Sequence, residues 1–436
     1  MRITVVGTGY LGAVHAACLA DLGFEVLGVD TDAAKIETLS AGTVPFYEPG
    51  LPEVLNRGIT SGKLHFTTSA EDGAAFGDVI FLCIGTPQRS DGYAADLSYL
   101  ETAVAALTPH LDRPVLVVGK STVPVGTAAR LAQHLAAAPG GDQVELAWNP
   151  EFLREGFAVE DTLHPDRLVF GVRSERAEQT LRTTYATPIS AGTPVVVTDF
   201  ATAELVKVAA NAFLATKISF INAMAEVCEA TGADVTQLAT ALGYDERIGR
   251  RFLQAGLGFG GGCLPKDIRA FLARAEELGV PEALEFLRDI DSINLRRRTR
   301  TIVAATELVG GTLTDRRIAC LGAAFKPDSD DVRDSPALYV ASALAAAGAE
   351  VRVTDPKAND NAKRRYPELA YVDNAFEAAA SADAVLLLTE WQDFRDLDPI
   401  ALAEVVSQPR ILDARNVLNP AQWREAGWMV RSLGRP

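Results

Sequence analysis

One cysteine stands where its chemistry could be used. The segment "GFGGGCLPKD" at 258–267 places Cys263 directly after a run of glycines. Pro265 is typical of the first turn of a helix, so we expect a helix here with Cys263 and Asp267 on one face. The positive helix end and nearby Lys266 favour the thiolate form of Cys263. We expect the bare glycine backbone to let a substrate approach closely. A buried structural cysteine beside a flexible loop is the alternative.

The other four cysteines lack such a setting. Cys18, Cys83, Cys228 and Cys320 lie in apolar or helical runs, where a small buried side chain is the expected role. Five scattered cysteines favour neither a disulfide framework nor a zinc site, and no metal is expected.

A second motif is typical of dinucleotide binding. Gly7, Gly9 and Gly12 of "GTGYLG" follow a predicted strand and open a helical pattern, and Asp30 ends the next strand. Such glycines permit a tight turn, close approach to a pyrophosphate and close helix packing. Asp30 would accept hydrogen bonds from ribose hydroxyls and repel a 2′-phosphate, which favours NAD over NADP. A glycine turn without a ligand is the alternative, and Lys35 is either near the adenosine or solvated.

Further polar residues follow predicted strands or share a helix face. "NPEFLREG" at 149–156 carries Glu151 and Glu155 after a strand, and Thr122 of "STVPVGT" follows another. These loops would lie over the carboxyl edge of a sheet. Lys207 and Asn211 are four residues apart on one helix, where a partly buried lysine needs a partner or serves as an oxyanion donor.

The order of elements predicts an α/β protein with two Rossmann-like doubly wound domains joined by a central helical domain. Apolar strands at 2–6, 25–30, 79–84, 115–118, 144–147 and 168–171 alternate with helices. A long helix follows from about 199, another begins near Pro281, and the strand pattern returns near 316. We expect domains at 1–198, 199–310 and 311–436.

Composition excludes several classes of partner. The 436 residues carry a formal net charge of −16, which argues against nucleic acid and anionic membranes. An anionic substrate would therefore need a local basic cluster. No apolar run is as long as a bilayer requires, and the N-terminus lacks the pattern of a signal peptide, so we expect a cytoplasmic protein.

Taken together, these motifs resemble the UDP-glucose/GDP-mannose dehydrogenase superfamily, and within it the UDP-glucose 6-dehydrogenases. The likeness covers essentially the whole chain. It rests on "GTGYLG", "CIGTP", "STVPVGT", "NPEFLREG", "KVAANAFLA", "RIGRRFLQAGLGFGGGCLPKD" and "FKPDSDDVRDSP" in the family's order. Gly262 departs from relatives that often carry serine, which we expect to make the loop more flexible.

The resemblance implies an NAD-dependent, four-electron oxidation of UDP-glucose to UDP-glucuronate. Cys263 would form a thiohemiacetal and then a thioester, Lys207 and Asn211 would stabilise the oxyanion, and the other residues implied in catalysis are Asp267, Thr122 and Glu151. The residues implied in NAD binding are Gly7, Gly9, Tyr10, Leu11, Gly12, Asp30, Lys35, Thr86, Thr122, Glu155, Lys266 and Arg333. Those implied in binding the sugar nucleotide are Glu151, Phe152, Leu153, Arg154, Glu155, Lys207, Asn211, Arg247, Phe252, Leu253, Gln254, Ala255, Gly256, Gly260, Lys326 and Arg415.

The resemblance also implies a homodimer through the long helices, in which Arg247 reaches the substrate of the neighbouring subunit. Together Lys207, Arg247, Lys326 and Arg415 would supply the expected basic cluster. Three alternatives stay open: a GDP-mannose or other UDP-hexose dehydrogenase, a non-catalytic NAD-binding scaffold, and a two-electron 3-hydroxyacid dehydrogenase that needs no thiol.

Overall fold

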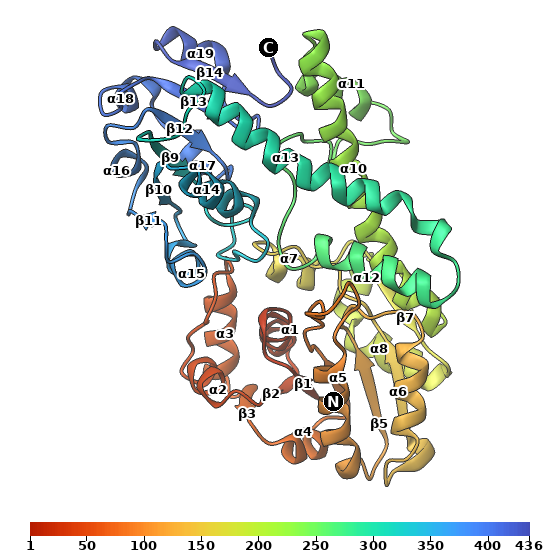
Figure 1. The fold of residues 1–436 in the computed structure, drawn as a ribbon. Coiled ribbons are helices and arrows are strands. Elements are labelled where there is room, and N and C mark those ends of the chain that lie inside the picture. Colours follow the sequence, from red (N-terminus) through yellow and green to blue (C-terminus); the bar gives the residue numbers. More distant parts are fainter. The chain divides into compact units, whose positions relative to one another are not determined.

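The computed structural model describes residues 1–436, which fold into two compact units (Figure 1). The first unit comprises Met1–Ala210 and Arg269–Gly279, and the second comprises Asn211–Ile268 and Val280–Pro436. The boundary passes through two helices, α10 (Phe200–Thr231) and α12 (Leu264–Glu277). The finer division into three domains remains a prediction.

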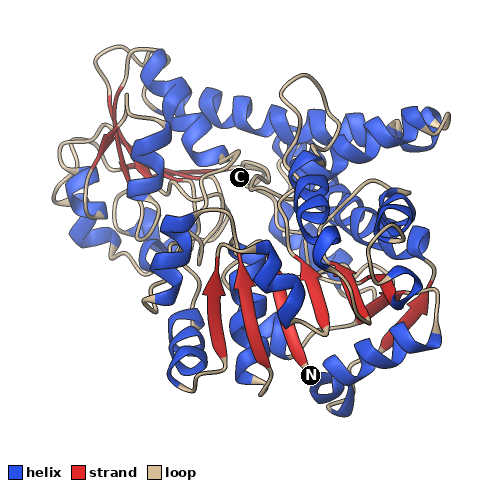
Figure 2. Ribbon diagram, turned by 90° about the horizontal axis from the view of Figure 1, so that it is seen from below, coloured by secondary structure: helices blue, strands red, loops and turns tan.

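The first unit is built on an eight-stranded sheet in the order β3-β2-β1-β4-β5-β6-β7-β8, whose strands are red in Figure 2. The strands are β1 (Arg2–Val6), β2 (Glu25–Val29), β3 (Leu64–Thr67), β4 (Val79–Leu82), β5 (Val115–Gly119), β6 (Val144–Trp148), β7 (Leu168–Gly171) and β8 (Val195–Thr198). All neighbours are parallel except β6 and β7, which meet antiparallel where Trp148 faces Gly171. The carboxyl end of β7 therefore lies at the opposite edge from those of β1 to β6.

Apolar residues alternate between the two faces of this sheet. Ile3, Val5 and Phe81 belong to one buried cluster, whereas Val6 and Ile80 belong to another. Strands that bury both faces need helices on each side, and their apolar runs explain why the sequence identified them. The helices of this unit are α1 (Tyr10–Asp21), α2 (Ala33–Ser40), α3 (Leu51–Thr60), α4 (Ala70–Phe76), α5 (Ser98–Leu107), α6 (Thr127–Leu135), α7 (Ala158–Leu163), α8 (Glu175–Thr184) and α9 (Ala186–Ser190).

The second unit holds a six-stranded parallel sheet in the order β11-β10-β9-β12-β13-β14. Its strands are β9 (Arg317–Leu321), β10 (Glu350–Thr354), β11 (Ala370–Tyr371), β12 (Ala384–Leu387), β13 (Arg410–Asp413) and β14 (Met429–Ser432). The helices that accompany them are α14 (Pro336–Ala346), α15 (Asn359–Arg365), α16 (Ala375–Ala379), α17 (Gln392–Arg395), α18 (Pro399–Ala403) and α19 (Pro420–Glu425). Both predicted Rossmann-like sheets are thus confirmed.

Long helices fill the middle of the chain. α10 ends before Gly232, whose φ of +75° is the left-handed conformation that glycine adopts without strain. α11 (Val235–Gly243) follows, and α13 (Phe286–Leu308) begins after a short 3₁₀ turn at Pro281–Leu284. The second long helix therefore starts five residues later than the sequence pattern indicated.

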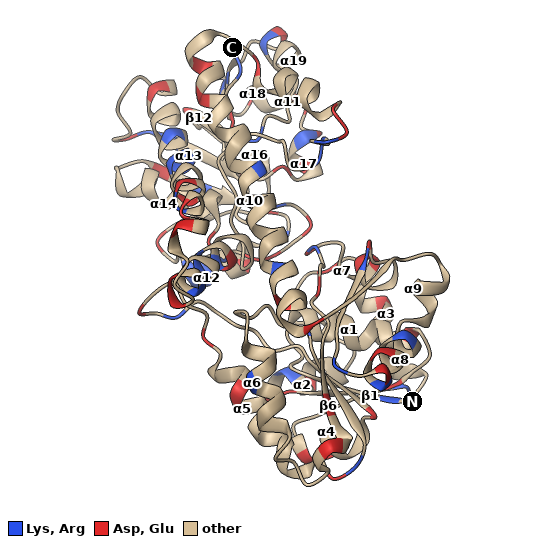
Figure 3. Cartoon of the chain, turned by 90° about the vertical axis from the view of Figure 1, so that its right-hand side faces the viewer, with Lys and Arg blue, Asp and Glu red and all other residues tan.

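By length and composition α10 could cross a membrane, so the prediction that no segment is long enough was wrong. Its polar residues are used inside the fold, however. Ser219 donates to the Ile290 carbonyl at 2.8 Å, and the Asn222 side chain accepts the Gly256 amide at 2.9 Å. These contacts pack the part of α10 after Ala210 into the second unit. Basic and acidic positions are interspersed in both units, as Figure 3 shows.

Candidate active site

Each of the three motif glycines is required for a different physical reason. Gly7 has φ +88°, and a Cβ there would lie 2.7 Å from the Cys83 carbonyl oxygen. A Cβ at Gly12 would lie 1.7 Å from the Gly7 carbonyl oxygen, so α1 packs against the turn only without a side chain. Gly9 faces open space and begins α1 without a side-chain cap. The amides of the first turn, at Tyr10 and Leu11, are therefore available to a pyrophosphate.

Asp30 lies beside this turn, at the end of β2. Its Oδ2 accepts the Thr8 amide at 2.8 Å and pairs with Lys35 Nζ at 2.9 Å. Burial alone would raise the pKa of Asp30, but hydrogen bonds from Lys35 and from the Asp32 and Thr8 amides hold it below its ordinary value. The carboxylate is thus ionised and fits a ribose diol. The residues of this edge fit NAD.

The loop 120–126 connects β5 to α6 and carries Thr122. The Thr86 hydroxyl donates to the Thr122 carbonyl at 2.7 Å, and Ser121 bonds to Ile84. The end of the loop is held by Glu204 of α10, which accepts the Gly126 and Ala128 amides. The predicted cofactor residues Thr86 and Thr122 are therefore neighbours.

The loop 149–157 connects β6 to α7 and carries the predicted carboxylates. Glu151 accepts the Leu153 amide at 2.6 Å and pairs with Lys207 Nζ at 2.9 Å. Lys207 is buried, so this ion pair is the partner that the sequence required of it. Arg154 is turned to Asp161 at 2.5 Å, while Phe152, Leu153 and Glu155 remain partly exposed.

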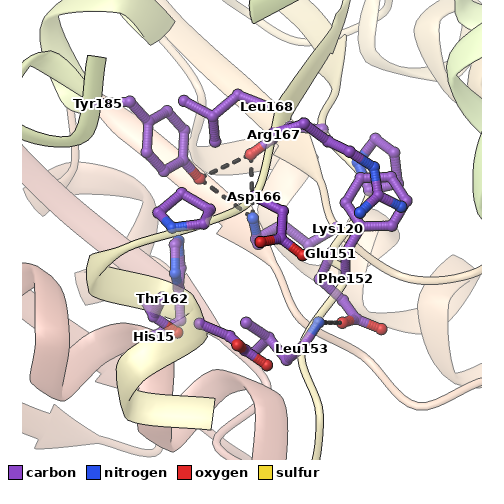
Figure 4. A pocket seen from close by; sticks show the side chains of 14 residues that line it. His15, Lys120, Glu151, Phe152, Leu153, Thr162, Asp166, Arg167, Leu168 and Tyr185 are labelled. Carbon is purple, nitrogen blue, oxygen red and sulfur yellow. Dashed lines mark hydrogen bonds between the residues drawn. The ribbon is translucent and has the colours of Figure 1, made fainter. Parts of the chain in front are cut away.

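A polar network lies beneath this loop (Figure 4). Lys120 Nζ donates to Asn149 Oδ1 at 3.0 Å and to the Tyr185 hydroxyl at 3.1 Å, and Tyr185 donates to Asn149 Oδ1 at 2.6 Å. Burial lowers the pKa of Lys120 to about 8. The side chains line a cavity of about 40 Å³, together with His15, whose Nε2 has no hydrogen-bond partner. Such a cavity has room for a few water molecules.

The second unit carries the thiol. Cys263 is exposed and immediately precedes α12, whereas Cys18, Cys83, Cys228 and Cys320 are all buried. Burial raises the pKa of Cys18, Cys83 and Cys320 to about 12, which keeps those thiols protonated. The predicted contrast between Cys263 and the rest is therefore confirmed.

Asp267 lies one turn into α12 and is 1% exposed. Its Oδ2 accepts the Asn211 side-chain amide at 2.6 Å, and its Oδ1 pairs with Lys266 Nζ at 2.5 Å. The structure thus brings Asn211, Lys266 and Asp267 together next to the cysteine in the chain. Lys207 lies one turn before Asn211 on α10. It belongs to the first unit, where it forms the ion pair with Glu151.

The glycine run before Cys263 packs closely against other segments of the second unit. A Cβ at Gly260 would lie 2.2 Å from the Asp334 carbonyl oxygen, and one at Gly261 would lie 2.8 Å from the Phe325 ring. A Cβ at Gly262 would lie 2.4 Å from Cζ of Arg333. The missing side chain of Gly262 therefore makes room for a guanidinium rather than merely adding flexibility.

Several predicted sugar-nucleotide residues are ordered by the second unit itself. Arg415 donates to the Leu388 carbonyl at 2.7 Å and pairs with Glu390 at 3.1 Å. A Cβ at Gly256 would lie 2.8 Å from the Ala414 carbonyl oxygen, which fixes the segment 252–256 against β13's outgoing loop. In that segment Leu253 and Ala255 are buried, whereas Phe252 and Gln254 are exposed.

Two further basic residues stay closer to solvent. Lys326 is partly exposed, with its Nζ 5.8 Å from the Phe325 ring centre. The Arg247 side chain is 88% exposed and pairs with Asp245 at 2.6 Å.

Sequence reasoning missed the residues that hold the loops in place. Lys120 and Asn149 stand beside recognised motif residues, so their buried network could have been suspected from position alone. Glu48 and Glu204 gave no such signal, because the backbone amides that bond to them are more than 70 residues away in the chain. No cluster of three or more His, Cys, Asp or Glu side chains with metal-binding geometry is present.

Three family models match successive parts of the chain. Residues 1–189 match the NAD binding domain of the UDP-glucose/GDP-mannose dehydrogenase family, residues 201–296 its central domain and residues 319–420 its UDP binding domain. A UDP-glucose 6-dehydrogenase of Rhizobium meliloti (strain 1021) is 40% identical over 439 residues, with 100% of both chains covered. One from Bacillus subtilis (strain 168) is also 40% identical, covering 100% of this chain and 98% of that protein.

Solved structures agree with these relatives. The UDP-glucose dehydrogenase of Pyrobaculum islandicum superposes with a TM-score of 0.91 at 38% identity, covering 100% of this chain and 98% of that one. A GDP-mannose dehydrogenase of Pseudomonas aeruginosa gives a TM-score of 0.55 at 29% identity, covering 99% and 100%. With the glycine turn, Asp30 and the exposed Cys263 in place, these matches show that the chain belongs to the UDP-glucose/GDP-mannose dehydrogenase family.

Proposed function

We propose that this protein oxidises UDP-glucose to UDP-glucuronate in two NAD-dependent steps without releasing the aldehyde. The observation that carries the proposal is the setting of Cys263, the one exposed cysteine, at the start of α12 beside Asp267. The relatives at 40% identity, all named UDP-glucose 6-dehydrogenases, support the substrate. The higher identity to a UDP-glucose dehydrogenase, 38% against 29% for a GDP-mannose dehydrogenase, favours glucose.

The proposed oxidation takes place in two steps. The residues of the Asp30 edge would hold NAD⁺, and two NAD⁺ molecules bound in turn would each accept one hydride. In the first, the primary alcohol loses a hydride and a proton and becomes an aldehyde. The sulfur of Cys263 then adds to the aldehyde carbon to give a thiohemiacetal, which loses a second hydride and its hydroxyl proton and becomes a thioester. Water adds to the thioester, and the carboxylate leaves as the thiol re-forms.

The buried polar groups would assist at defined points. Lys207 holds Glu151 at 2.9 Å, which fixes the position from which the carboxylate would move a proton. Asn211 and Lys266 hold the Asp267 carboxylate from both sides, so that its position near the thiol is fixed for activating water. The nucleotide would be bound by Arg415, Lys326 and the segment 252–256 of the second unit.

We also propose a cytoplasmic homodimer formed through α10. Phe213, Phe220 and Val227 are spaced by seven residues and are 66%, 46% and 52% exposed, so they form one apolar stripe on the helix. Such a stripe is typical of a helix that packs against a partner. The exposed Arg247 would then contribute to the neighbouring subunit.

The test measures NADH formed per UDP-glucose consumed. The wild type should form two NADH for each UDP-glucuronate, and Cys263→Ala should form no UDP-glucuronate. Cys228→Ala removes a buried thiol and serves as the matched control with activity retained. Two NADH per substrate from Cys263→Ala would contradict the covalent route. NAD binding without NADH formation from any sugar nucleotide would favour the scaffold alternative. Faster oxidation of GDP-mannose than of UDP-glucose would identify GDP-mannose as the substrate instead.

A further inference from the structure

Two loops that carry proposed catalytic groups are each fastened by a buried glutamate from a distant part of the chain. The loop 120–126 carries Thr122 and leads into α6, and the loop 149–157 carries Glu151 and leads into α7. Neither helix has a side-chain cap of its own at Gly126 or Phe157. The first amides of both helices therefore need an acceptor from elsewhere.

Glu204 supplies that acceptor for α6. Its Oε2 accepts the Gly126 amide at 2.7 Å, and its Oε1 accepts the Ala128 amide at 2.6 Å. The residue is 2% exposed, although burial raises the pKa of its carboxyl group and makes ionisation costly. Arg274 adds a bond to the Val125 carbonyl of the same loop at 3.0 Å.

Glu48 does the same for α7. Its Oε2 accepts the Gly156 amide at 2.6 Å, and its Oε1 accepts the Ala158 amide at 2.6 Å. The Tyr10 hydroxyl of the dinucleotide turn donates to Glu48 and also lies 3.1 Å from the Gly156 amide. Glu48 is 2% exposed, so this carboxylate ties the loop of Glu151 to the turn that would hold the pyrophosphate.

The two arrangements share one geometry. In each, a carboxylate bridges the amides of residues i and i+2 where a loop becomes a helix, with one oxygen for each amide. A bidentate contact fixes the orientation of the loop as well as its distance, because both oxygens of a rigid planar group must be matched. Glu204 and Lys207 are three residues apart on α10, so a single helix turn holds the Thr122 loop and, through the Lys207–Glu151 pair, the Glu151 loop.

We propose that Glu48 and Glu204 are positioning residues for the oxidation: they touch neither substrate nor cofactor and act by setting Glu151 and Thr122 relative to the nucleotide turn. The inference rests on the proposed function. It explains why two glutamate side chains, each 2% exposed, are buried where these loops become helices. A loop shift of about 1 Å at a reacting group costs about 100-fold in rate.

The test is a pair of double-mutant cycles read in kcat. Glu204→Gln keeps the volume but leaves one oxygen to serve two amides, and should lower kcat by about 10- to 100-fold with the KM for UDP-glucose nearly unchanged. In a Thr122→Ala background the same change should lower kcat by less than about twofold, since the group it positions is gone. Glu48→Gln should behave likewise against Glu151→Gln.

The matched control is Ser174→Ala, which removes the ordinary cap of α8 at the opposite edge of the sheet. Ser174 accepts the Ala177 amide at 3.0 Å and follows β7, so its loss should lower the melting temperature while kcat stays within about twofold of wild type. The proposal would be overturned if the losses of kcat in Glu204→Gln and Glu48→Gln multiplied with those of Thr122→Ala and Glu151→Gln in the double variants. Independent losses of this kind would show general destabilisation.

Hydrogen exchange separates this proposal from the proposed function. Loss of protection confined to 120–128 in Glu204→Gln and to 149–158 in Glu48→Gln supports the positioning role, even if the wild type does not oxidise UDP-glucose. Unchanged protection in both loops overturns it. A wild type that forms no NADH from UDP-glucose contradicts only the proposed substrate.

Discussion

Replacement of Lys120 with methionine is expected to remove a pH-dependent penalty on the fold. Lys120 is 6% exposed, and its Nζ bonds only to neutral oxygens of Asn149 and Tyr185. The pKa of Lys120 falls from 10.5 to about 8, mainly because the side chain is buried. This net value includes smaller effects of nearby groups: Cys83 and Glu151 raise the pKa, and Lys207 lowers it. One pKa unit corresponds to about 1.4 kcal/mol, so the charged form costs the folded state about 3 kcal/mol at neutral pH.

The sign of the pH dependence follows from proton binding. Between pH 8 and pH 10.5 the folded protein releases the proton of Lys120 while the unfolded chain still holds it. The unfolded state then binds more protons, so the contribution of Lys120 to the free energy of unfolding rises with pH across this window. Below pH 8 both states are protonated and the full penalty applies. The buried cysteines titrate in the opposite sense, but they are present in both proteins.

Urea unfolding of wild type and Lys120→Met at a series of pH values measures the difference directly. At neutral pH the variant should be at least as stable as the wild type, because Tyr185 still satisfies Asn149 at 2.6 Å. Toward pH 10 the wild type should gain about 3 kcal/mol relative to the variant. Parallel stability curves for the two proteins would refute the reasoning, since they would mean that Lys120 titrates alike in both states.

Other changes test the site and the assembly. Asp267→Asn should give a burst of two NADH per subunit followed by turnover about 100-fold slower, with a sugar-nucleotide adduct on Cys263 in the intact mass; an unmodified enzyme would contradict its role. Gly12→Ala places a Cβ 1.7 Å from the Gly7 carbonyl oxygen and should destabilise the first unit by ~3 kcal/mol, whereas Gly9→Ala faces open space and should weaken only NAD binding, as thermal unfolding and NAD titration would measure. Phe220→Glu, in the apolar stripe of α10, should yield monomers in light scattering, and an unchanged dimer would place the interface elsewhere.

The sequence predicted those parts of the fold and site that depend on short segments, and missed those that depend on residues distant in the chain. The glycine turn, Asp30 and the strands β1, β2, β4, β5 and β6 were identified because their patterns lie within short segments. The reversal of β7 could not be predicted, because the apolar run "LVFG" reads the same in either direction. The strands β3 and β8 were missed because "LHFT" and "VVVT" are short edge strands with partly exposed side chains.

The glycine run at 258–262 shows a limit of the same kind. Its bare backbone indicated that another group approaches closely, and the sequence suggested a substrate. The structure adds close contacts with Asn294, Phe325, Arg333 and Asp334, which are distant in the chain and gave no signal in the sequence. Glu48 and Glu204 escaped notice for the same reason, since the amides that hold them belong to other segments.

In each sheet one strand is followed directly by an aspartate, Asp30 after β2 and Asp355 after β10. Only Asp30 has oxygens that could accept hydrogen bonds from a ribose. Asp355, after β10, is 3% exposed and accepts the amides of Ala323, Ala324, Lys357 and Ala358 and the indole of Trp391. Five donors at 2.8–3.0 Å saturate both oxygens, so no acceptor remains for a ligand.

Asp30 is held differently. One of its donors is the flexible Lys35 side chain, 28% exposed, which can turn aside, and its Oδ1 accepts the Asp32 amide at 3.1 Å. A ribose diol could replace the Lys35 contact at little cost. The repeated strand-end aspartate is therefore a shared fold feature that leaves an accessible carboxylate in one unit and a fixed turn anchor in the other. A nucleotide bound by the second unit would therefore need contacts other than this carboxylate, and we propose that basic side chains and backbone supply them.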